Sequence, residues 1–434
     1  MDVAMQATLV LFIAFLVQLV IGIPISISIG ISAIITALTI LPQDVVLFTM
    51  AQKMVTGIDS FSLLAVPLFV LSGNIMNNGG IARKLVNFAK AIGGRLPGSL
   101  AHANILGNML FGALSGSAVA AAVAIGGTMA PIQKSEGYDP AYSAAVNIAS
   151  APTGMLIPPS GVLILYSLVA GGVSISALFI AGYIPGILMG LACMVVAYIY
   201  AKKNNYPVSE KVTFLEGFKT FLEAIPSLLL IIIVIGGIVF GAFTATEGAA
   251  IAVLYPLVLS LIYKSITWRD MKEILLKTGV TTGVIMFLVA ASTTMSWIMA
   301  FTGIPQAISE AIMSISQDPI IILLIMNITL LIVGTFMDLT PAVLIFTPIF
   351  LPIATNLGMH PVHFGIILVF NLCIGIMTPP VGSVLFVGCG IAEVSIEKAI
   401  KPLLPFFAAL IIVLFFITYI PAISLFLPRM FGLI

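Results

Sequence analysis

The sequence contains very little charge. Only 8% of its 434 residues are Asp, Glu, Lys or Arg, against about 25% in soluble globular proteins. This scarcity excludes a water-soluble fold. The balance of 17 basic and 16 acidic residues also excludes a nucleic-acid binder, because no basic surface is available to neutralise phosphates. Cysteine is scarce too. Cys193, Cys373 and Cys389 form no CxxC motif, so we expect them to be small buried side chains.

Enzyme motifs are also missing. The chain has no GxSxG, HExxH, Walker A or GxGxxG motif, so we expect no enzyme, no cofactor and no ATP-driven step. His360 and His363 have an i, i+3 spacing but lack a third ligand, and we predict no metal site there. The N-terminus has neither a positively charged start nor a small-residue cleavage site, so a signal peptide is not expected.

Long apolar runs dominate what is present. Apolar residues make up 61% of the chain, and from Val3 to Gln43 there is no charge at all. A membrane span needs about 20 apolar residues, and Gly22-Ile23-Pro24 divides this first run in two. We predict an all-α polytopic membrane protein. Its spans are expected near 5–22, 24–41, 60–76, 139–171, 176–202, 224–243, 246–264, 278–301, 361–391 and 403–427.

Two further apolar regions, 96–134 and 318–356, are each longer than one span and have a polar or small interruption in the middle. Ser115-Gly116-Ser117 interrupts the first, and Gly334 to Asp338 interrupts the second, after which Thr340-Pro341 is expected to cap and restart a helix. We interpret both regions as re-entrant helical hairpins. The spans at 139–171 and 361–391 each contain a Pro-Pro pair, which predicts two broken helices.

The distribution of Lys and Arg predicts the topology, because basic residues concentrate in cytoplasmic loops. Three basic clusters occur between the predicted spans. Placing all three in the cytoplasm makes the first hairpin open from the cytoplasm and the second from the opposite side, with both termini periplasmic. The segments at 81–94 and 211–223 are amphipathic and basic, and we expect surface helices there. The clusters are Arg83, Lys84, Lys90 and Arg95; Lys202, Lys203, Lys211 and Lys219; and Lys264, Arg269, Lys272 and Lys277.

The chain contains an internal repeat, with a constant offset that carries Pro131 onto Pro352. Pro and Gly positions coincide without gaps under this offset, and these residues fix the backbone shape. The repeat predicts a first unit at 1–202, a cytoplasmic linker or surface helix at 203–223, and a second unit of opposite orientation at 224–434. Each unit has five spans and one hairpin, a pattern typical of secondary transporters. The other pairs are Gly137 and Gly358, Pro140 and Pro361, Gly154 and Gly375, Pro158 and Pro379, Pro159 and Pro380, and Gly161 and Gly382.

Broken helices in a membrane leave backbone groups that lipid cannot satisfy. Half-helix N-termini suit an anion, whereas unwound carbonyls and C-terminal ends suit Na⁺. We therefore predict two Na⁺ sites, each formed by a hairpin tip and the broken helix of its own repeat, with an anionic solute between them.

Acidic residues are rare inside the predicted membrane regions. Asp338 is the only acid well inside one, which makes it a functional candidate, although a helix cap is the alternative. Glu247 follows Thr246 near the start of a predicted span, and we expect it to be a cap. Other candidate polar side chains at the predicted sites are Ser115, Ser117, Asn147, Ser160, Thr335, Asn371, Thr378 and Ser383.

Four motifs in combination resemble the large membrane subunit of tripartite ATP-independent periplasmic (TRAP) transporters. They are Leu114 to Ala120, Ile157-Pro158-Pro159-Ser160, Gly334 to Asp338 and Thr378 to Gly382. The resemblance implies a bacterial or archaeal inner-membrane protein with an elevator-type fold. It also implies Na⁺ as the coupling ion, a small four-helix membrane subunit and a periplasmic substrate-binding protein as partners, and organic acids such as C4-dicarboxylates or sialic acid as solutes.

Carried over to this chain, the resemblance implies specific site residues. The first sodium site would use Ser115, Gly116, Ser117, Gly154 and Pro158, and the second Gly334, Thr335, Asp338, Gly375 and Thr378. Independently of the resemblance, the polar side chains at and near the breaks lead us to predict solute contacts at Ser117, Asn147, Ser160, Asp338 and Asn371. Two alternatives stay open at this point. One is a self-sufficient divalent-anion/Na⁺ symporter without a binding protein, and the other is a passive channel.

Overall fold

The computed structural model describes residues 3–78, 81–93, 96–206, 208 and 214–434. Within these ranges every regular element is a helix. Seven helices are long and apolar enough to cross a membrane. Two bent helix pairs add two candidate spans, namely Gln43–Ile58 with Phe61–Asn77, and Pro140–Leu156 with Gly161–Val169. Large apolar side chains are exposed on the outside, with Val20 at 87% and Phe240 at 81%. Such a surface requires lipid as its solvent, so the prediction of an all-helical, multi-pass membrane protein is confirmed.

The described part of the first half begins with helices separated by short turns. They are α1 (Val3–Val20), α2 (Ile25–Leu38), α3 (Gln43–Ile58), η1 (Phe61–Leu64), α4 (Ala65–Asn78) and α5 (Ile81–Gly93). The first interrupted region and the first broken helix follow. They are α6 (Ser99–Ser115), α7 (Ala118–Ala121), the π-helix η2 (Ala122–Gly126), α8 (Gly127–Ser135), α9 (Pro140–Ser150), α10 (Thr153–Leu156), α11 (Gly161–Val169) and α12 (Ile175–Lys203).

The second half has the same order of elements with longer single helices. They are α13 (Phe214–Val239), α14 (Ala245–Ile262), α15 (Trp268–Thr302), α16 (Ile304–Ile315), α17 (Pro319–Phe336), α18 (Leu339–Asn356), α19 (Pro361–Gly375), α20 (Ser383–Ile391), α21 (Ile396–Tyr419) and α22 (Ala422–Met430). Several boundaries recur at the offset of the sequence repeat: the arm α7–η2–α8 covers 118–135, and α18 covers 339–356. The helices α12 and α21 likewise begin at Ile175 and Ile396.

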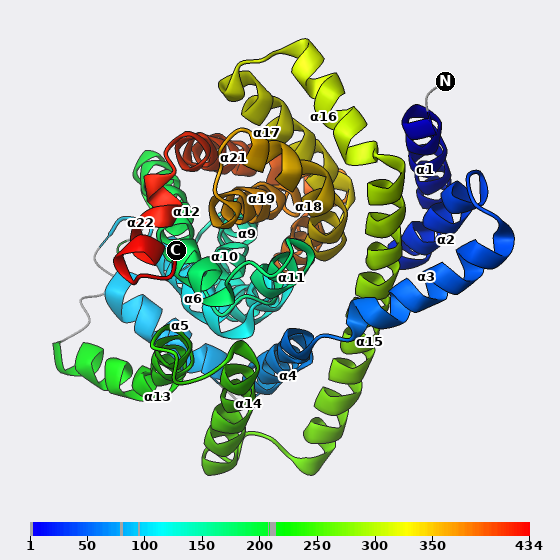
Figure 1. Cartoon of the computed structure of the whole chain (residues 1–434). Coiled ribbons are helices and arrows are strands. Elements are labelled where there is room, and N and C mark those ends of the chain that lie inside the picture. The colour runs from blue at the N-terminus through cyan, green and yellow to red at the C-terminus, as the bar shows by residue number, and fades with distance from the viewer. Residues whose placement is uncertain (1–2, 79–80, 94–95, 207, 209–213) are drawn as a thin grey trace.

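The helices form a central group and an outer framework (Figure 1). The central group contains both interrupted regions and both broken helices, namely α6–α12 and α17–α22. The framework contains α1–α4 and α13–α15. The 35-residue helix α15 packs against α2, α3 and α4 and also reaches α18 of the central group. At the heart of the central group the two broken helices touch, and the Cys373 thiol lies 3.7 Å from the Pro152 carbonyl oxygen.

All three cysteines are free and buried, as the sequence predicted. The prediction of a cap for Glu247 is also confirmed, because its carboxylate accepts from the Thr244 backbone N–H and Thr244 accepts from the Glu247 N–H. This reciprocal capping box satisfies two of the donors that a helix start leaves open.

Three local predictions were wrong. The segment before residue 224 is not a separate surface helix, because α13 continues from Phe214 through Pro226 to Val239. Glu216, Lys219 and Glu223 have the i, i+3 and i, i+4 spacings of one helix face, which favours continuation. The remaining part of the predicted linker, at 207 and 209–213, lies outside the described residues.

The other two corrections concern helix ends. Thr340 does not cap the helix after the second interruption: α18 begins at Leu339 with Asp338 in the N-cap position, so Pro341 falls in its first turn. Proline is tolerated there because its missing N–H has no intrahelical acceptor. The last predicted span is divided, since α21 ends at Tyr419 and α22 begins at Ala422. Pro421 cannot donate to the preceding turn, which accounts for this break.

Candidate functional site

The first hairpin tip is a two-residue interruption between α6 and α7. Gly116 ends α6 in the left-handed region at φ 61°, which a residue with a Cβ rarely adopts. Ser117 then caps the next helix, its hydroxyl oxygen accepting from the Ala120 backbone N–H at 3.2 Å. The Ser115 hydroxyl donates to the Ser117 carbonyl oxygen at 3.5 Å. The tip therefore presents hydroxyl and backbone groups rather than apolar side chains.

This tip packs directly on the first broken helix. A Cβ on Gly154 would lie only 2.2 Å from Gly112 Cα, so the two backbones approach as closely as glycine allows. At the end of the tip, a Cβ on Gly116 would lie 3.4 Å from the Pro159 carbonyl oxygen. The halves of the broken helix, Pro140–Leu156 and Gly161–Val169, are bent by 50°. The first tip and the first broken helix, which carry the predicted members of the first sodium site, are thus adjacent in space.

The second tip, between α17 and α18, has the same arrangement. A Cβ on Gly375 would lie 2.4 Å from Gly334 Cα, and the Val381 backbone N–H donates to the Thr335 carbonyl oxygen at 3.2 Å. The hydroxyls of Thr335 and Thr378 donate to carbonyls within their own helices at 2.7 Å, which leaves lone pairs on both hydroxyl oxygens. The predicted members of the second sodium site are also adjacent.

Asp338 makes no side-chain cap bond although it occupies the N-cap position of α18. Its Oδ1 instead accepts from the Ser383 hydroxyl at 3.2 Å, across to the first residue of α20. An aspartate at an N-cap ordinarily accepts from the backbone N–H of its own helix. The carboxylate of Asp338 is therefore held toward the broken helix rather than used to close its own helix end.

A cleft of about 730 Å³ lies between the tips and the framework, beside a close contact of Gly73 on α4 with the Ser115 backbone. On the central side it is lined by the first residues of four half-helices: Ala118–Ala120 of α7, Gly161 and Val162 of α11, Leu339–Pro341 of α18, and Ser383 of α20. Framework helices α2, α4 and α15 line the opposite side. Half-helix N-termini present free N–H groups and partial positive charge, so this wall suits an anion.

The predicted site residues lie at different depths. Those that line the cleft are Ser115, Gly116, Ser117, Asp338 and Ser383. The other predicted site residues do not line the cleft. Gly154, Gly334, Thr335 and Gly375 lie at the contacts between tips and broken helices, whereas Pro158 and Thr378 lie in the breaks themselves. Ser160 is fully buried, and its hydroxyl donates to the Met155 carbonyl oxygen at 2.6 Å across the break.

Asn147 and Asn371, both predicted solute contacts, are buried away from this lining. The Asn147 carboxamide oxygen accepts from the amides of Asn104 and Asn108 at 3.3 and 3.0 Å. Its own amide donates to the Ala122 carbonyl oxygen in the π-helix at 3.0 Å. Asn371 donates to the Asn327 carboxamide oxygen at 2.7 Å. Each asparagine joins a broken helix to its hairpin, which is a positioning role.

We expect Asn147→Ala to destabilise the protein by about 1–3 kcal/mol, because it removes the acceptor of two buried amides. A thermal unfolding curve of the purified protein measures this. Asn77→Ala serves as the control, since Asn77 lines the cleft and is only partly buried. Equal stability of the two variants would contradict the positioning role.

Sequence reasoning missed the polar residues on the framework side of the cleft. Asn74 and Asn77 lie on α4, and Lys277 and Thr281 lie on α15. The Asn74 amide donates to the Thr278 hydroxyl oxygen at 2.9 Å, which joins the two helices at this level. The available signal was a pair of asparagines at i, i+3 at the end of an apolar run.

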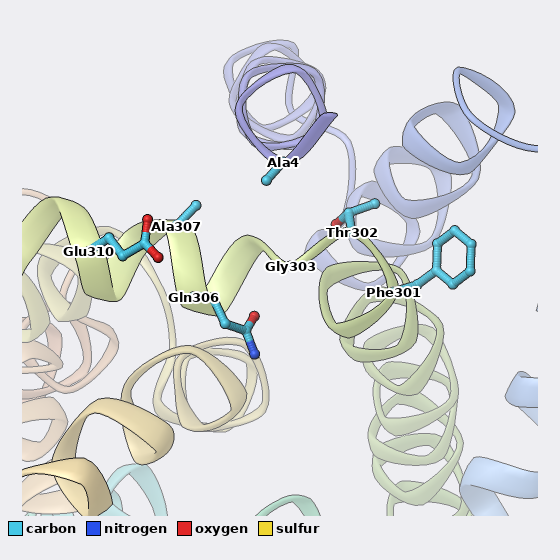
Figure 2. Close-up of a pocket in the computed structure, with 7 residues that line it drawn as sticks. All are labelled: Ala4, Phe301, Thr302, Gly303, Gln306, Ala307 and Glu310. Carbon is cyan, nitrogen blue, oxygen red and sulfur yellow. The ribbon is translucent and has the colours of Figure 1, made fainter. Parts of the chain in front are cut away.

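A smaller cavity of about 380 Å³ lies elsewhere, between α1 and the junction of α15 with α16. Figure 2 shows Ala4 facing this junction across the cavity, with Thr302 at the end of α15 and Glu310 on α16. Among the described residues, its lining contains one acid and no base, and no residue of a hairpin tip. This cavity does not suit an organic anion, so the cleft at the tips is the candidate site.

A multi-pass helical fold with polar half-helix ends facing an internal cleft defines a membrane protein of the transporter class. The chain matches the family model described as the tripartite ATP-independent periplasmic transporter, DctM component, over residues 12–423. It therefore belongs to this family, as the four motifs indicated.

Relatives match the chain over nearly its whole length. A Salmonella typhimurium protein named YgiK is 56% identical, with 98% of each chain covered. The sialic acid TRAP transporter large permease protein SiaM of Vibrio cholerae is 39% identical over 93% of this chain and 95% of SiaM. The isethionate TRAP transporter permease protein DctMQ of Oleidesulfovibrio alaskensis is 40% identical over 96% of this chain but only 66% of DctMQ.

The fold is shared with known structures, including a transporter. The YdaH transporter of Alcanivorax borkumensis superposes with a TM-score of 0.60, covering 91% of this chain and 90% of YdaH, at 14% identity. At this identity the similarity concerns the fold alone.

Proposed function

We propose that the chain is the large permease subunit of a Na⁺-coupled secondary transporter that takes up an organic acid of the C4-dicarboxylate or sialic acid type. The observation that carries the proposal is the wall of four half-helix N-termini on one cleft, with Asp338 among them. This wall offers partial positive charge to a carboxylate. Relatives named for sialic acid and C4-dicarboxylate transport support the solute class.

The two contacts between a tip and its broken helix are the proposed sodium sites. At each contact a glycine pair brings a helix C-terminal end against an interrupted helix, which concentrates carbonyl oxygens. Serine hydroxyls at the first contact and Thr335, Thr378 and Asp338 at the second add further oxygen ligands. Oxygen donors suit a hard cation, and Asp338 gives the second site a full negative charge.

The proposed mechanism is of the elevator type. The central group would carry the solute past the framework, and the cleft between the two bodies is where the solute would bind. Helix boundaries that recur at the offset of the sequence repeat support two structurally related halves, 1–202 and 224–434. The basic clusters of the sequence favour opposite orientations for these halves. Such inverted repeats allow one binding site to face either side of a membrane in turn.

The proposed setting is the inner membrane of a bacterium or archaeon, with both termini periplasmic. The proposed partners are a small four-helix membrane subunit and a periplasmic substrate-binding protein that delivers the solute. DctMQ supports the first partner, because about a third of that relative lies beyond the part matching this chain.

Uptake by proteoliposomes tests the proposal. The complex of this chain with both partners would be supplied with radiolabelled succinate, N-acetylneuraminate and isethionate, with and without an inward Na⁺ gradient. We expect uptake of one of these anions that requires Na⁺ and the binding protein. Uptake without the binding protein would favour the self-sufficient symporter, and uptake without a Na⁺ gradient would favour the passive channel.

Cysteine labelling tests the movement of the first tip. We expect the labelling rate of Ser117→Cys to change several-fold on adding Na⁺ and solute, because the tip lies between the two bodies. The three native cysteines are buried, so the background is low. Ser314→Cys, on the exposed surface of α16, should label at a constant rate. A constant rate at position 117 as well would argue against a moving central group.

A further inference from the structure

The framework wall of the cleft carries polar side chains close to where α4 packs on the first hairpin tip, since a Cβ on Gly73 would lie 2.8 Å from the Ser115 carbonyl oxygen. Lys277 and Thr281 lie one turn apart on α15, and Asn77 lies on the facing helix α4. The hydrogen bond from Asn74 to Thr278, next to Lys277 in the chain, fixes α4 and α15 together at this level. Apolar side chains such as Val284 and Leu288 line α15 farther along. Lys277 and Leu288 are about 16 Å apart along the helix axis at 1.5 Å per residue.

Charge is distributed very unevenly over the lining. Among the described residues that line the cleft, Lys277 is the only base and Asp338 the only acid. The sequence has no other Lys or Arg between Lys277 and Lys398, so the second hairpin and its broken helix bring no positive side chain to the cleft. The cleft wall therefore offers a solute anion one full positive charge, besides the partial charges of the half-helix ends.

Lys277 differs in position from its basic neighbours. Lys264, Arg269 and Lys272 belong to the same basic cluster. The concentration of basic residues in cytoplasmic loops accounts for the presence of each of them equally well. Only Lys277 of this cluster lines the cleft. Its side chain is exposed and, with Asn77 and Thr281 beside it, an incoming carboxylate would find one charged and two neutral donors.

We propose that Lys277 is a solute-binding residue at the end of the cleft nearest the basic cluster. It binds the anionic group of the solute from the framework wall, opposite the half-helix ends, as the solute enters or leaves the cleft on that side. This inference rests on the proposed function and adds a second, separate contact to the transport path. The shared chemistry of its ligand is one negatively charged carboxylate or sulfonate group, which a lysine recognises as a point charge.

The test compares binding from the two faces of the membrane. The complex is reconstituted in vesicles, with succinate and N-acetylneuraminate as probes. The half-saturating solute concentration is measured once with solute on the side of the basic cluster and once with solute on the opposite side. We expect Lys277→Gln to raise the half-saturating concentration about tenfold on the side of the basic cluster, as loss of a charge-assisted hydrogen bond predicts. The value for the opposite side should stay within twofold.

Two variants make the result specific. Lys277→Arg keeps the charge and should retain near-normal half-saturation. Lys272→Gln removes a neighbouring exposed charge that does not line the cleft, and should leave both values unchanged. An unchanged Lys277→Gln variant, or an equal shift in Lys272→Gln, would overturn the inference while leaving the proposed function intact. Absence of any Na⁺-driven uptake by the unmodified complex would overturn both.

Discussion

Asp338→Asn is expected to reduce Na⁺-driven uptake by about 100-fold, which corresponds to about 2.7 kcal/mol. The carboxylate lies at the second tip, does not cap its own helix, and accepts from the Ser383 hydroxyl. In a site formed mainly by carbonyl and hydroxyl oxygens, its negative charge offsets the cost of removing water from Na⁺. Asparagine keeps the shape but supplies no charge, so the Na⁺ concentration for half-maximal uptake should rise steeply.

The matched control is Asp318→Asn on the same hairpin. Asp318 caps α17, its Oδ1 accepting from the Ile320 backbone N–H at 2.9 Å, and asparagine can serve in that role. Uptake and its Na⁺ dependence should be nearly unchanged in this variant. If Asp338→Asn behaved in the same way, Asp338 would not be a sodium ligand, and the proposed second site would have to rest on neutral oxygens alone.

Gly154→Ala and Gly375→Ala are each expected to lower uptake at least tenfold. The added methyl would lie within 2.2 to 2.4 Å of backbone atoms of Gly112 or Gly334, and backbone cannot turn aside as a flexible side chain can. The tip must therefore move away from the broken helix, at a cost of about 1–3 kcal/mol for overpacking. Because the proposed sodium ligands come from both sides of this contact, the Na⁺ concentration for half-maximal uptake should rise together with the loss of rate.

The control for both variants is Gly127→Ala on the arm of the first hairpin. A Cβ at Gly127 meets nothing within 4 Å, and alanine favours a helix by up to about 1 kcal/mol over glycine. This variant should transport normally and unfold at the same or a slightly higher temperature. Normal Na⁺ dependence in Gly154→Ala and Gly375→Ala would show that the close glycine contacts serve packing and not ion binding.

Much of the fold was accessible from the sequence because the lipid environment permits few solutions. In a chain with 8% charged residues, nearly every apolar run must be buried in the protein or face lipid. Helices are favoured in lipid because their backbone groups hydrogen-bond to one another. The interruptions at Ser115–Ser117 and at Asp338 were visible because glycine, proline and polar residues stand out in such a composition. Helix ends were harder, as the continuous α13 and the divided end of the last span demonstrate.

The residues at the tips were predictable from the sequence. Which of the other polar candidates would reach the cleft was not. Asn147, Asn371 and Ser160 have side chains as suitable for a carboxylate as Ser117 has. Packing commits all three to buried hydrogen bonds within the central group. Whether a polar side chain faces a cleft or a neighbouring helix depends on how helices far apart in sequence pack together, and no local pattern encodes that.

The sequence by itself determined that this chain is a helical membrane protein with two interrupted hairpins and two broken helices, since composition, proline and glycine act locally on the backbone. Only the tertiary structure decided how closely each tip approaches its broken helix, because the contacts of Gly112 with Gly154 and of Gly334 with Gly375 join different helices. It also decided that Asp338 is held by Ser383 and that Lys277 faces the same cleft from the opposite wall. The glycine contacts and the Asp338–Ser383 bond depend on packing within the central group, and the position of Lys277 depends on packing of the framework against it.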